Sequence, residues 1–208
     1  MCRRDDVAAP RVGRDVAGAP RAGKDWWRVA PDTGGDSLTV VQMAAGWDPA
    51  AKRRWLPGKV KDIDLNAAAL LFAGDAIVDV VYHEQLTSQD GSVRLLGDNT
   101  TGEGEGDDEI ITLDLTRISP RVTTVFFLVT CYTGQTFEKI EHAFCRVVDG
   151  RTKTEIARYD LSKIHAHTGF LAGKLVRAQE GWKFRSIDEE IQAEHPVEAL
   201  PQLAPFLA

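Results

Sequence analysis

The run Val125-Phe126-Phe127-Leu128-Val129 is apolar at every position. Successive side chains of a β-strand point to opposite faces of its sheet, so a strand of this composition must be covered on both sides. We therefore expect it at the centre of a β-sandwich. The chain around it agrees, because short apolar or alternating runs are separated by turn residues such as Gly74-Asp75, Asp149-Gly150 and Glu180-Gly181.

This pattern predicts an all-β fold, a two-sheet β-sandwich with short helical elements and a C-terminal helical segment. One helical turn is expected in the loop Gly134–Ile140. The expected strands are Leu38–Ala45, Leu65–Phe72, Ile77–Tyr82, Ser92–Leu96, Glu109–Leu115, Val122–Tyr132, Ala143–Val148, Glu155–Tyr159, Gly169–Arg177 and Trp182–Ile187.

The last part of the chain changes character. Ser186-Ile187-Asp188-Glu189 resembles the capping box that opens a helix, and Pro196 suits a first helical position. The helical spacing of Leu200, Leu203 and Leu207 supports a helix here. Pro201 and Pro205 should keep that helix short or broken.

A chain of 208 residues with 43% hydrophobic side chains suits one large or two small soluble domains. Residues 1–24 carry six basic and three acidic side chains and few bulky aliphatics, which predicts a disordered basic tail. We expect the β-sandwich domain to span 25–187 and the C-terminal helical extension to span 188–208.

Charge and hydropathy exclude several classes of protein. Beyond the tail, the chain carries 19 basic and 28 acidic residues, which argues against nucleic acid as a partner and favours cations. The longest apolar stretch, Ala67 to Ala73, is too short to span a membrane. The first residues lack the apolar region of a signal peptide, so a cytoplasmic protein is expected. The basic tail leaves peripheral contact with an anionic membrane as a weaker alternative.

The second informative stretch is the thirteen-residue run Gly97–Glu109, which contains six carboxylates, one amide and four glycines. Close carboxylates repel one another unless a cation neutralises them. Ca²⁺ takes six to eight oxygen ligands in flexible geometry, and glycines allow sharp turns that expose carbonyl oxygens. The run is therefore interpreted as a calcium loop.

The run has two other interpretations. It can be a solvated acidic hairpin loop. It can also be an EF-hand, since Asp98 to Glu109 spans twelve residues, but Glu103 stands where that loop requires glycine and the flanks resemble strands. A second acidic site favours calcium: Asp62, Asp64 and Asn66 alternate where a strand begins, and could present a row of oxygens to the same cation.

Together, the two acidic segments resemble the TerD family of tellurium-resistance and stress proteins. The resemblance covers roughly residues 37–187. It rests on Asp64-Leu65-Asn66-Ala67-Ala68, on the Gly97–Glu109 run with its GDN…TGxGxGDDE pattern, and on the shorter segments Gly46-Trp47-Asp48, Ser88 to Val93, Gly134-Gln135-Thr136-Phe137, Ala143-Phe144-Cys145-Arg146 and Glu155-Ile156-Ala157-Arg158-Tyr159.

The resemblance implies a sandwich that binds Ca²⁺ at one end, with ligands from the loop and from the strand at Asp64. Where the family usually has Asp and Ser, this chain has Asn66 and Ala68, so one carboxylate is lost and weaker binding, or the loss of a second ion, is expected. Carried over, the first-rank ligands are Asp64, Asn66, Asp98, Asn99, Asp107, Asp108 and Glu109, with main-chain carbonyls of Thr101, Gly102 and Gly104, and Asp62 and Asp90 in second rank.

We therefore expect a non-enzymatic, cytoplasmic stress-response protein with Ca²⁺ as its cofactor. Its loaded loop would recruit protein partners, for which other stress-response proteins are candidates. One alternative is a metal-dependent enzyme, for which His83 is the only histidine close in sequence to serve as a general base. The other is a small-ligand domain of the cyclic-nucleotide-binding kind, for which no basic or aromatic pocket is evident.

Overall fold

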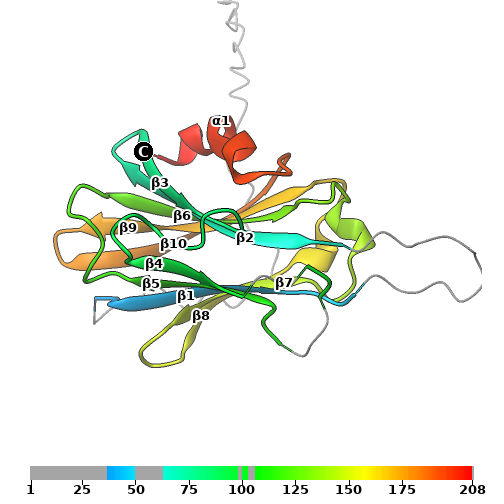
Figure 1. Ribbon diagram of the computed structural model, residues 1–208, viewed down its shortest axis with the longest axis horizontal. Helices are drawn as coiled ribbons and strands as arrows, with labels where there is room; N and C mark the ends of the chain where they lie inside the picture. The colour runs from blue at the N-terminus through cyan, green and yellow to red at the C-terminus, as the bar shows by residue number, and fades with distance from the viewer. Residues whose placement is uncertain (1–36, 50–62, 98–99, 103–105, 208) are drawn as a thin grey trace, which may run out of the picture.

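Two antiparallel five-stranded sheets pack face to face in the computed structural model, which describes residues 37–49, 63–97, 100–102 and 106–207 (Figure 1). The β1 sheet has the order β4-β5-β1-β7-β8, and the β6 sheet has the order β10-β9-β6-β2-β3. The expected two-sheet sandwich is confirmed. Each of the ten expected strands has a counterpart: β1 Val40–Gly46, β2 Leu65–Ala73, β3 Ala76–Val81, β4 Val93–Leu96, β5 Glu109–Asp114, β6 Thr124–Cys131, β7 Phe144–Asp149, β8 Glu155–Asp160, β9 Gly169–Ala178 and β10 Gly181–Ile191.

Strand β6 lies at the centre of its sheet, between β9 and β2, and all its residues are buried. Val125, Phe127 and Val129 face the other sheet and join the core between the two layers. Phe126 and Leu128 face the opposite side and belong to a second apolar cluster. The expectation that this strand is covered on both faces is therefore confirmed.

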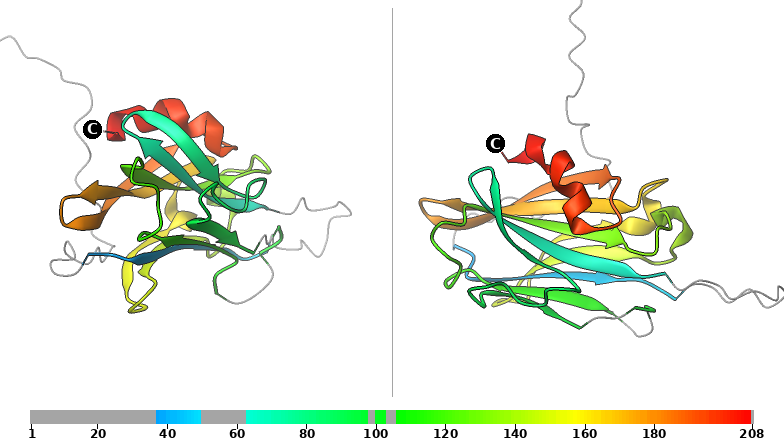
Figure 2. Two further views of the ribbon diagram at one scale, coloured as in Figure 1. Left: turned by 60° about the vertical axis from the view of Figure 1, so that its left-hand side comes forward. Right: turned by 45° about the horizontal axis from the view of Figure 1, so that its top comes forward.

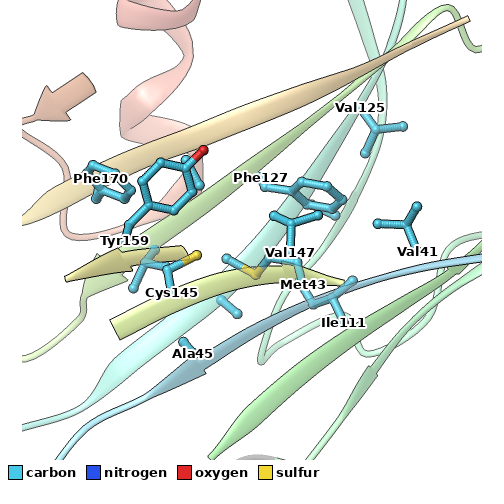
Figure 3. Packing of buried hydrophobic residues seen from close by; sticks show 14 of the residues in the cluster. Val41, Met43, Ala45, Ile111, Val125, Phe127, Cys145, Val147, Tyr159 and Phe170 are labelled. Atoms are coloured by element: carbon cyan, nitrogen blue, oxygen red, sulfur yellow. The ribbon is translucent and has the colours of Figure 1, made fainter. Parts of the chain in front are cut away.

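The core between the sheets is built from large apolar side chains of both layers (Figure 3). Met43 and Val147 of the β1 sheet lie in the same cluster as Phe127 and Phe170 of the β6 sheet, and each is at most 1% exposed. Full burial of such a side chain stabilises the fold by about 1.5–3 kcal/mol. This core is the rigid frame on which the acidic loop is carried.

A chain of short helical turns covers the outer face of the β6 sheet (Figure 2). It consists of η3 Pro196–Ala199, α1 Leu200–Leu203 and η4 Ala204–Phe206, so the expected short, broken helix is confirmed. Leu203 is fully buried in the second apolar cluster. The buried Lys174 ammonium of β9 donates a hydrogen bond to the Phe206 carbonyl and holds the end of this segment on the sheet.

The expected capping box at Ser186–Glu189 is wrong, because β10 continues through these residues to Ile191. Its pairing with β9 shifts between Ser186 and Glu189, where a bulge with Asp188 at a φ of 58° absorbs one extra residue. Hydrogen bonds to β9 on both sides of the bulge outweigh the local helix signal. The capping box instead lies at His195 and Glu198, and the helical segment begins at Pro196 rather than at residue 188.

The remaining connections carry two further helical turns, η1 Phe137–Lys139 and η2 Leu161–Lys163. The first confirms the turn expected within Gly134–Ile140. The predicted disordered tail, 1–24, lies outside the described residues. Within the described part of the chain, no helix is long and apolar enough to cross a membrane.

Candidate metal site

The three acids that end the acidic run are each held by a different segment of the chain. Asp107 forms an ion pair with Arg146 of β7. The Asp108 Oδ2 accepts a hydrogen bond of 2.9 Å from the backbone N–H of Trp47, directly after β1. The Glu109 Oε2 accepts one of 2.6 Å from the backbone N–H of Ala67 in β2. Consecutive carboxylates thus tie the loop to both sheets.

Glu109 is the first residue of β5 and is fully buried. Strand β3 pairs with β2 only from Ala69 onward, so β2 is an open edge at Ala67. The Glu109 carboxylate reaches from the β1 sheet to this edge and accepts the N–H that a strand would otherwise take. A backbone N–H stabilises the carboxylate through one hydrogen bond and leaves its negative charge in place.

Trp47 joins the acidic loop to the beginning of β2. Its indole Nε1 donates a hydrogen bond of 3.0 Å to the carbonyl of Ile63, the residue before Asp64. Gly102 lies against the same ring with a φ of +69°, and a Cβ atom there would come within 2.6 Å of the indole. Only glycine combines that backbone conformation with so close an approach. Trp47 therefore brings Gly102 and Asp108 to the segment that contains Asp64.

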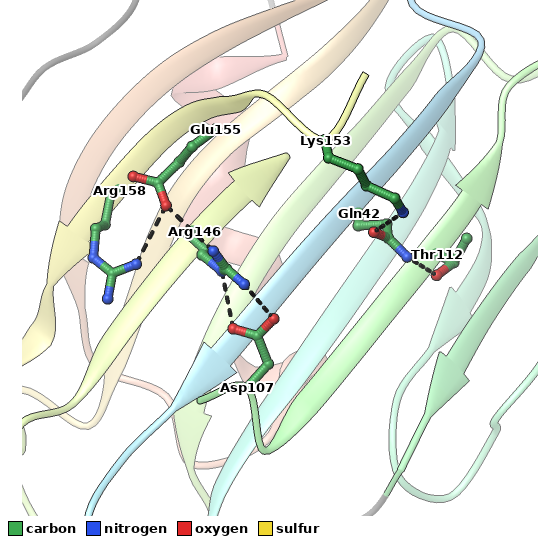
Figure 4. A network of polar contacts seen from close by, with 7 residues as sticks. All are labelled: Gln42, Asp107, Thr112, Arg146, Lys153, Glu155 and Arg158. Carbon is green, nitrogen blue, oxygen red and sulfur yellow. Dashed lines mark hydrogen bonds and ion pairs between the residues drawn. The ribbon is translucent and has the colours of Figure 1, made fainter. Parts of the chain in front are cut away.

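The ion pair of Asp107 and Arg146 lies on the outer face of the β1 sheet (Figure 4). The Arg146 Nε donates to Oδ1 at 2.9 Å and Nη2 donates to Oδ2 at 2.7 Å. The hydrogen bond from the guanidinium to Asp107 is the main cause of a raised pKa of Arg146. Arg146 also lies 3.5 Å from Glu155, which forms a second ion pair with Arg158 at 3.2 Å.

Asn66 lies on the outer face of the β6 sheet, the face that carries Ala68 and Leu70. It is 1% exposed and stands opposite Thr130 of β6. Its Nδ2 is buried without a hydrogen-bond partner among the described residues. Asp64, two residues earlier and directly before β2, is half-buried, and its backbone N–H donates to Thr133 Oγ1 at 3.2 Å.

The second-rank candidate Asp90 has a local structural role. Its Oδ1 accepts hydrogen bonds from Ser88 Oγ and Ser92 N, at 2.8 and 2.9 Å, and its Oδ2 accepts one of 3.0 Å from the backbone N–H of Ser119. Desolvation alone would raise the pKa of Asp90, but the hydrogen bonds outweigh it and lower the pKa to about 2. Oδ1 thus holds the β3–β4 connection together, and Oδ2 fastens it to the loop after β5.

Four predicted ligands, Asp62, Asp98, Asn99 and Gly104, lie outside the described residues. Within the described part of the chain, no three His, Cys, Asp or Glu side chains are grouped so as to hold a metal ion. His83, which the enzyme alternative would need as a base, packs edge-on against the Tyr132 ring, with the ring centres 4.9 Å apart.

The chemistry of the described donors fits a hard cation. Asp64, Thr101, Gly102, Asp108 and Glu109 offer carboxylate, hydroxyl and carbonyl oxygens, the ligands that Ca²⁺ takes in proteins. The softer candidates are elsewhere: Cys145 is fully buried in the core, where burial raises the pKa of its thiol.

Sequence reasoning missed the roles of Trp47 and Arg146. It treated Trp47 as a packing residue and did not connect Arg146 with the loop. Both stand in segments that carried the family resemblance, Gly46-Trp47-Asp48 and Ala143-Phe144-Cys145-Arg146. Their presence beside the acidic run was the signal available, and only the fold shows which acid each of them holds.

Comparisons with known proteins agree with this architecture. A solved structure described as an unknown-function protein, SAV2460, superposes with a TM-score of 0.69 at 26% identity and covers 79% of this chain and 96% of its own. A solved homologue of telluride resistance protein (TerD), SCO6318 from Streptomyces coelicolor, has a TM-score of 0.68 at 24% identity, over 79% of this chain and 96% of its own. The second likeness supports the fold alone.

Sequence relatives match a similar share of the chain. The tellurium resistance protein TerZ of Serratia marcescens is 38% identical over 155 residues, which cover 73% of this chain and 80% of that protein. The stress response protein SCP2 of Bacillus subtilis is 31% identical over 175 residues, which cover 78% of this chain and 88% of that protein. The model of the TerD domain matches residues 29–200. The chain therefore belongs to the TerD domain family.

Proposed function

We propose that the chain is a calcium-binding, non-enzymatic stress-response protein of the tellurium-resistance type, acting in the cytoplasm. In this proposal Ca²⁺ lies between the acidic loop 97–109 and the beginning of β2, and the loaded loop forms a surface for protein partners. The resistance and stress roles are those by which TerZ and SCP2, two relatives of this chain, are named.

The observation that carries the proposal is the meeting of the acidic loop with β2 at Trp47. Trp47 holds Asp108 through its backbone N–H and Ile63 through its indole, so Asp108 and Asp64 are carried by residues that share one anchor. Glu109 reaches β2 independently, at Ala67. Oxygen ligands from two distant segments are thereby brought to one end of the sandwich, which is what a hard cation needs.

Calcium would supply the positive charge that this set of acids needs to stay together. Asp64, Asp108 and Glu109 would hold the ion through carboxylates, and Thr101 and Gly102 would contribute main-chain oxygens. The fold keeps Asp108 and Glu109 in place beforehand through backbone donors. Binding to the folded form alone raises its stability, by about 2.7 kcal/mol when calcium is at a hundredfold excess over its dissociation constant.

The test is a thermal melt of the whole chain in about 1 mM Ca²⁺, a concentration that loads even weak extracellular modules, in equal Mg²⁺, and in chelator. We expect calcium alone to raise Tm, and Asp108→Asn to lose most of that rise. Asp75→Asn is the matched control, because Asp75 is an exposed acid in the β2–β3 turn. A wild-type melt that is the same in calcium and in chelator overturns the proposal.

A further inference from the structure

Two acids of the run, Asp107 and Glu109, lie on opposite sides of the β1 sheet. Glu109 faces the interior and bonds Ala67 of the other sheet. Asp107 reaches the outer face, because Arg146 alternates along β7 with Cys145 and Val147, which face the core. For Asp107 to share an ion with Asp64, which directly precedes β2, the Asp107 carboxylate would have to leave the outer face.

The end of the loop is fitted to this outward position. A Cβ atom on Gly46 would come within 2.3 Å of the Gly106 carbonyl, so the loop crosses the end of β1 only because Gly46 has no side chain. Gly106 turns there with a φ of +100°. Directly after this turn, both carboxylate oxygens of Asp107 are taken by the guanidinium of Arg146.

We infer that Arg146 and Asp107 are a positioning pair, which fixes the end of the acidic loop so that Asp108 and Glu109 face the cation, and that Asp107 is not itself a ligand. The inference rests on the proposed calcium site. A planar guanidinium that binds both oxygens fixes the direction as well as the position of a carboxylate. With Asp107 held outward, the next two residues reach Trp47 and Ala67.

The sign of a charge effect separates this role from its rival. If Arg146 only competed with calcium for Asp107, its removal would free a ligand and remove a repelling charge, and calcium would bind more tightly. If the pair positions the loop, its removal weakens binding in spite of the lost repulsion. Removing partners that orient metal ligands typically costs roughly ten- to a hundredfold in affinity.

The experiment is calorimetric titration of Ca²⁺ into the whole chain and two single variants, Arg146→Met and Arg158→Met. Arg158 lies in β8, beside Arg146 in register and paired with Glu155, so its loss removes a similar charge from the same face without touching Asp107. We expect Arg146→Met to raise the Kd by roughly tenfold or more. Arg158→Met should leave the Kd for calcium unchanged or lower it slightly, because it removes only a repelling charge.

A charge-swapped double variant, Asp107→Arg with Arg146→Asp, guards against a single variant that fails to fold. It restores an ion pair but leaves no carboxylate at position 107, so recovery of calcium binding supports positioning. Absence of recovery in a folded double variant, or tighter binding by Arg146→Met, overturns the inference and makes Asp107 a ligand. A wild-type chain that takes up no calcium instead overturns the proposed function, and the role of the pair with it.

Discussion

The Glu109 carboxylate and the Ala67 backbone N–H form a hydrogen bond of 2.6 Å that joins the two sheets of the sandwich. Both residues are fully buried, and β5 and β2 belong to different layers. The last acid of the loop is thus a structural contact of the fold and, under the proposed function, a ligand. As a ligand the carboxylate needs its negative charge, whereas as a buried structural contact it is costly to keep charged.

Substitution of Glu109 by Gln should separate the two roles. The amide keeps an oxygen that accepts the Ala67 N–H, and a buried negative charge disappears, so Tm in chelator should stay the same or rise. The calcium-dependent rise in Tm should be largely lost, because the ligand has lost its charge. Melts in chelator and in calcium measure both effects.

Glu109→Ala is the control for the structural role. It leaves the buried Ala67 N–H without its acceptor, which should cost about 1–3 kcal/mol in the free energy of unfolding measured with urea. A Gln variant that keeps the full calcium effect would remove Glu109 from the ligand set.

The core strands could be predicted from sequence because their composition leaves few choices. Val125-Phe126-Phe127-Leu128-Val129 is apolar on both faces, and the structure covers both. The same property hid the direction of Asn66. Strand β2 is apolar on both faces after it, so alternation showed that Asp64 and Asn66 share a face but not which face that is.

The contacts of the acidic loop could not be predicted in the same way. The donors to Asp108 and Glu109 are backbone N–H groups, which have no signature in sequence. Arg146 lies 39 positions from Asp107, and only the pairing of β7 with β1 brings them together. The capping-box pattern at Ser186 failed for a related reason, since pairing with β9 overrode a local preference.

Gly102→Ala should weaken calcium binding by displacing the loop from Trp47. The new Cβ would lie 2.6 Å from the indole, and the residue has a φ of +69°. Gly74→Ala is the matched control, because Gly74 has a φ of +63° with nothing within 4 Å of its would-be Cβ.

Backbone strain alone costs about 1–2 kcal/mol, so both glycine variants should lower Tm in chelator. Only Gly102→Ala should also raise the Kd for calcium in a calorimetric titration. Equal Kd values for the two variants would show that contact of the loop with Trp47 does not shape the site.

Asp90 should make stability depend on pH in the acid range. Its pKa is lowered from 3.8 to about 2 in the folded chain, since hydrogen bonds from Ser92, Ser119 and Ser88 outweigh desolvation. A lowered carboxyl pKa contributes stability that is present above 3.8 and is lost as pH falls towards about 2.

Asp90→Ala should therefore destabilise the chain near neutral pH, and its difference from wild type should shrink between about pH 4 and pH 2. Urea unfolding at a series of pH values measures this difference. Ser92→Ala removes the hydroxyl that donates to Asp90 but keeps the backbone N–H that also donates to it. This variant should show a weaker form of the same effect. A difference that is constant with pH would contradict the assigned role.

Restoring a carboxylate at position 66 should have opposite effects with and without calcium. Asn66 is 1% exposed, so Asn66→Asp buries a charge, and Tm in chelator should fall. If this position belongs to the calcium site, the added charge should enlarge the calcium-dependent rise in Tm beyond that of wild type.

Asn66→Leu is the matched control of similar volume. It removes the buried Nδ2 that lacks a partner among the described residues, so Tm in chelator should stay the same or rise. It also removes the side-chain oxygen, so the calcium effect should shrink if this position belongs to the calcium site. An Asp variant with the calcium response of wild type would place Asn66 outside the site, in agreement with its position on the outer face of the β6 sheet.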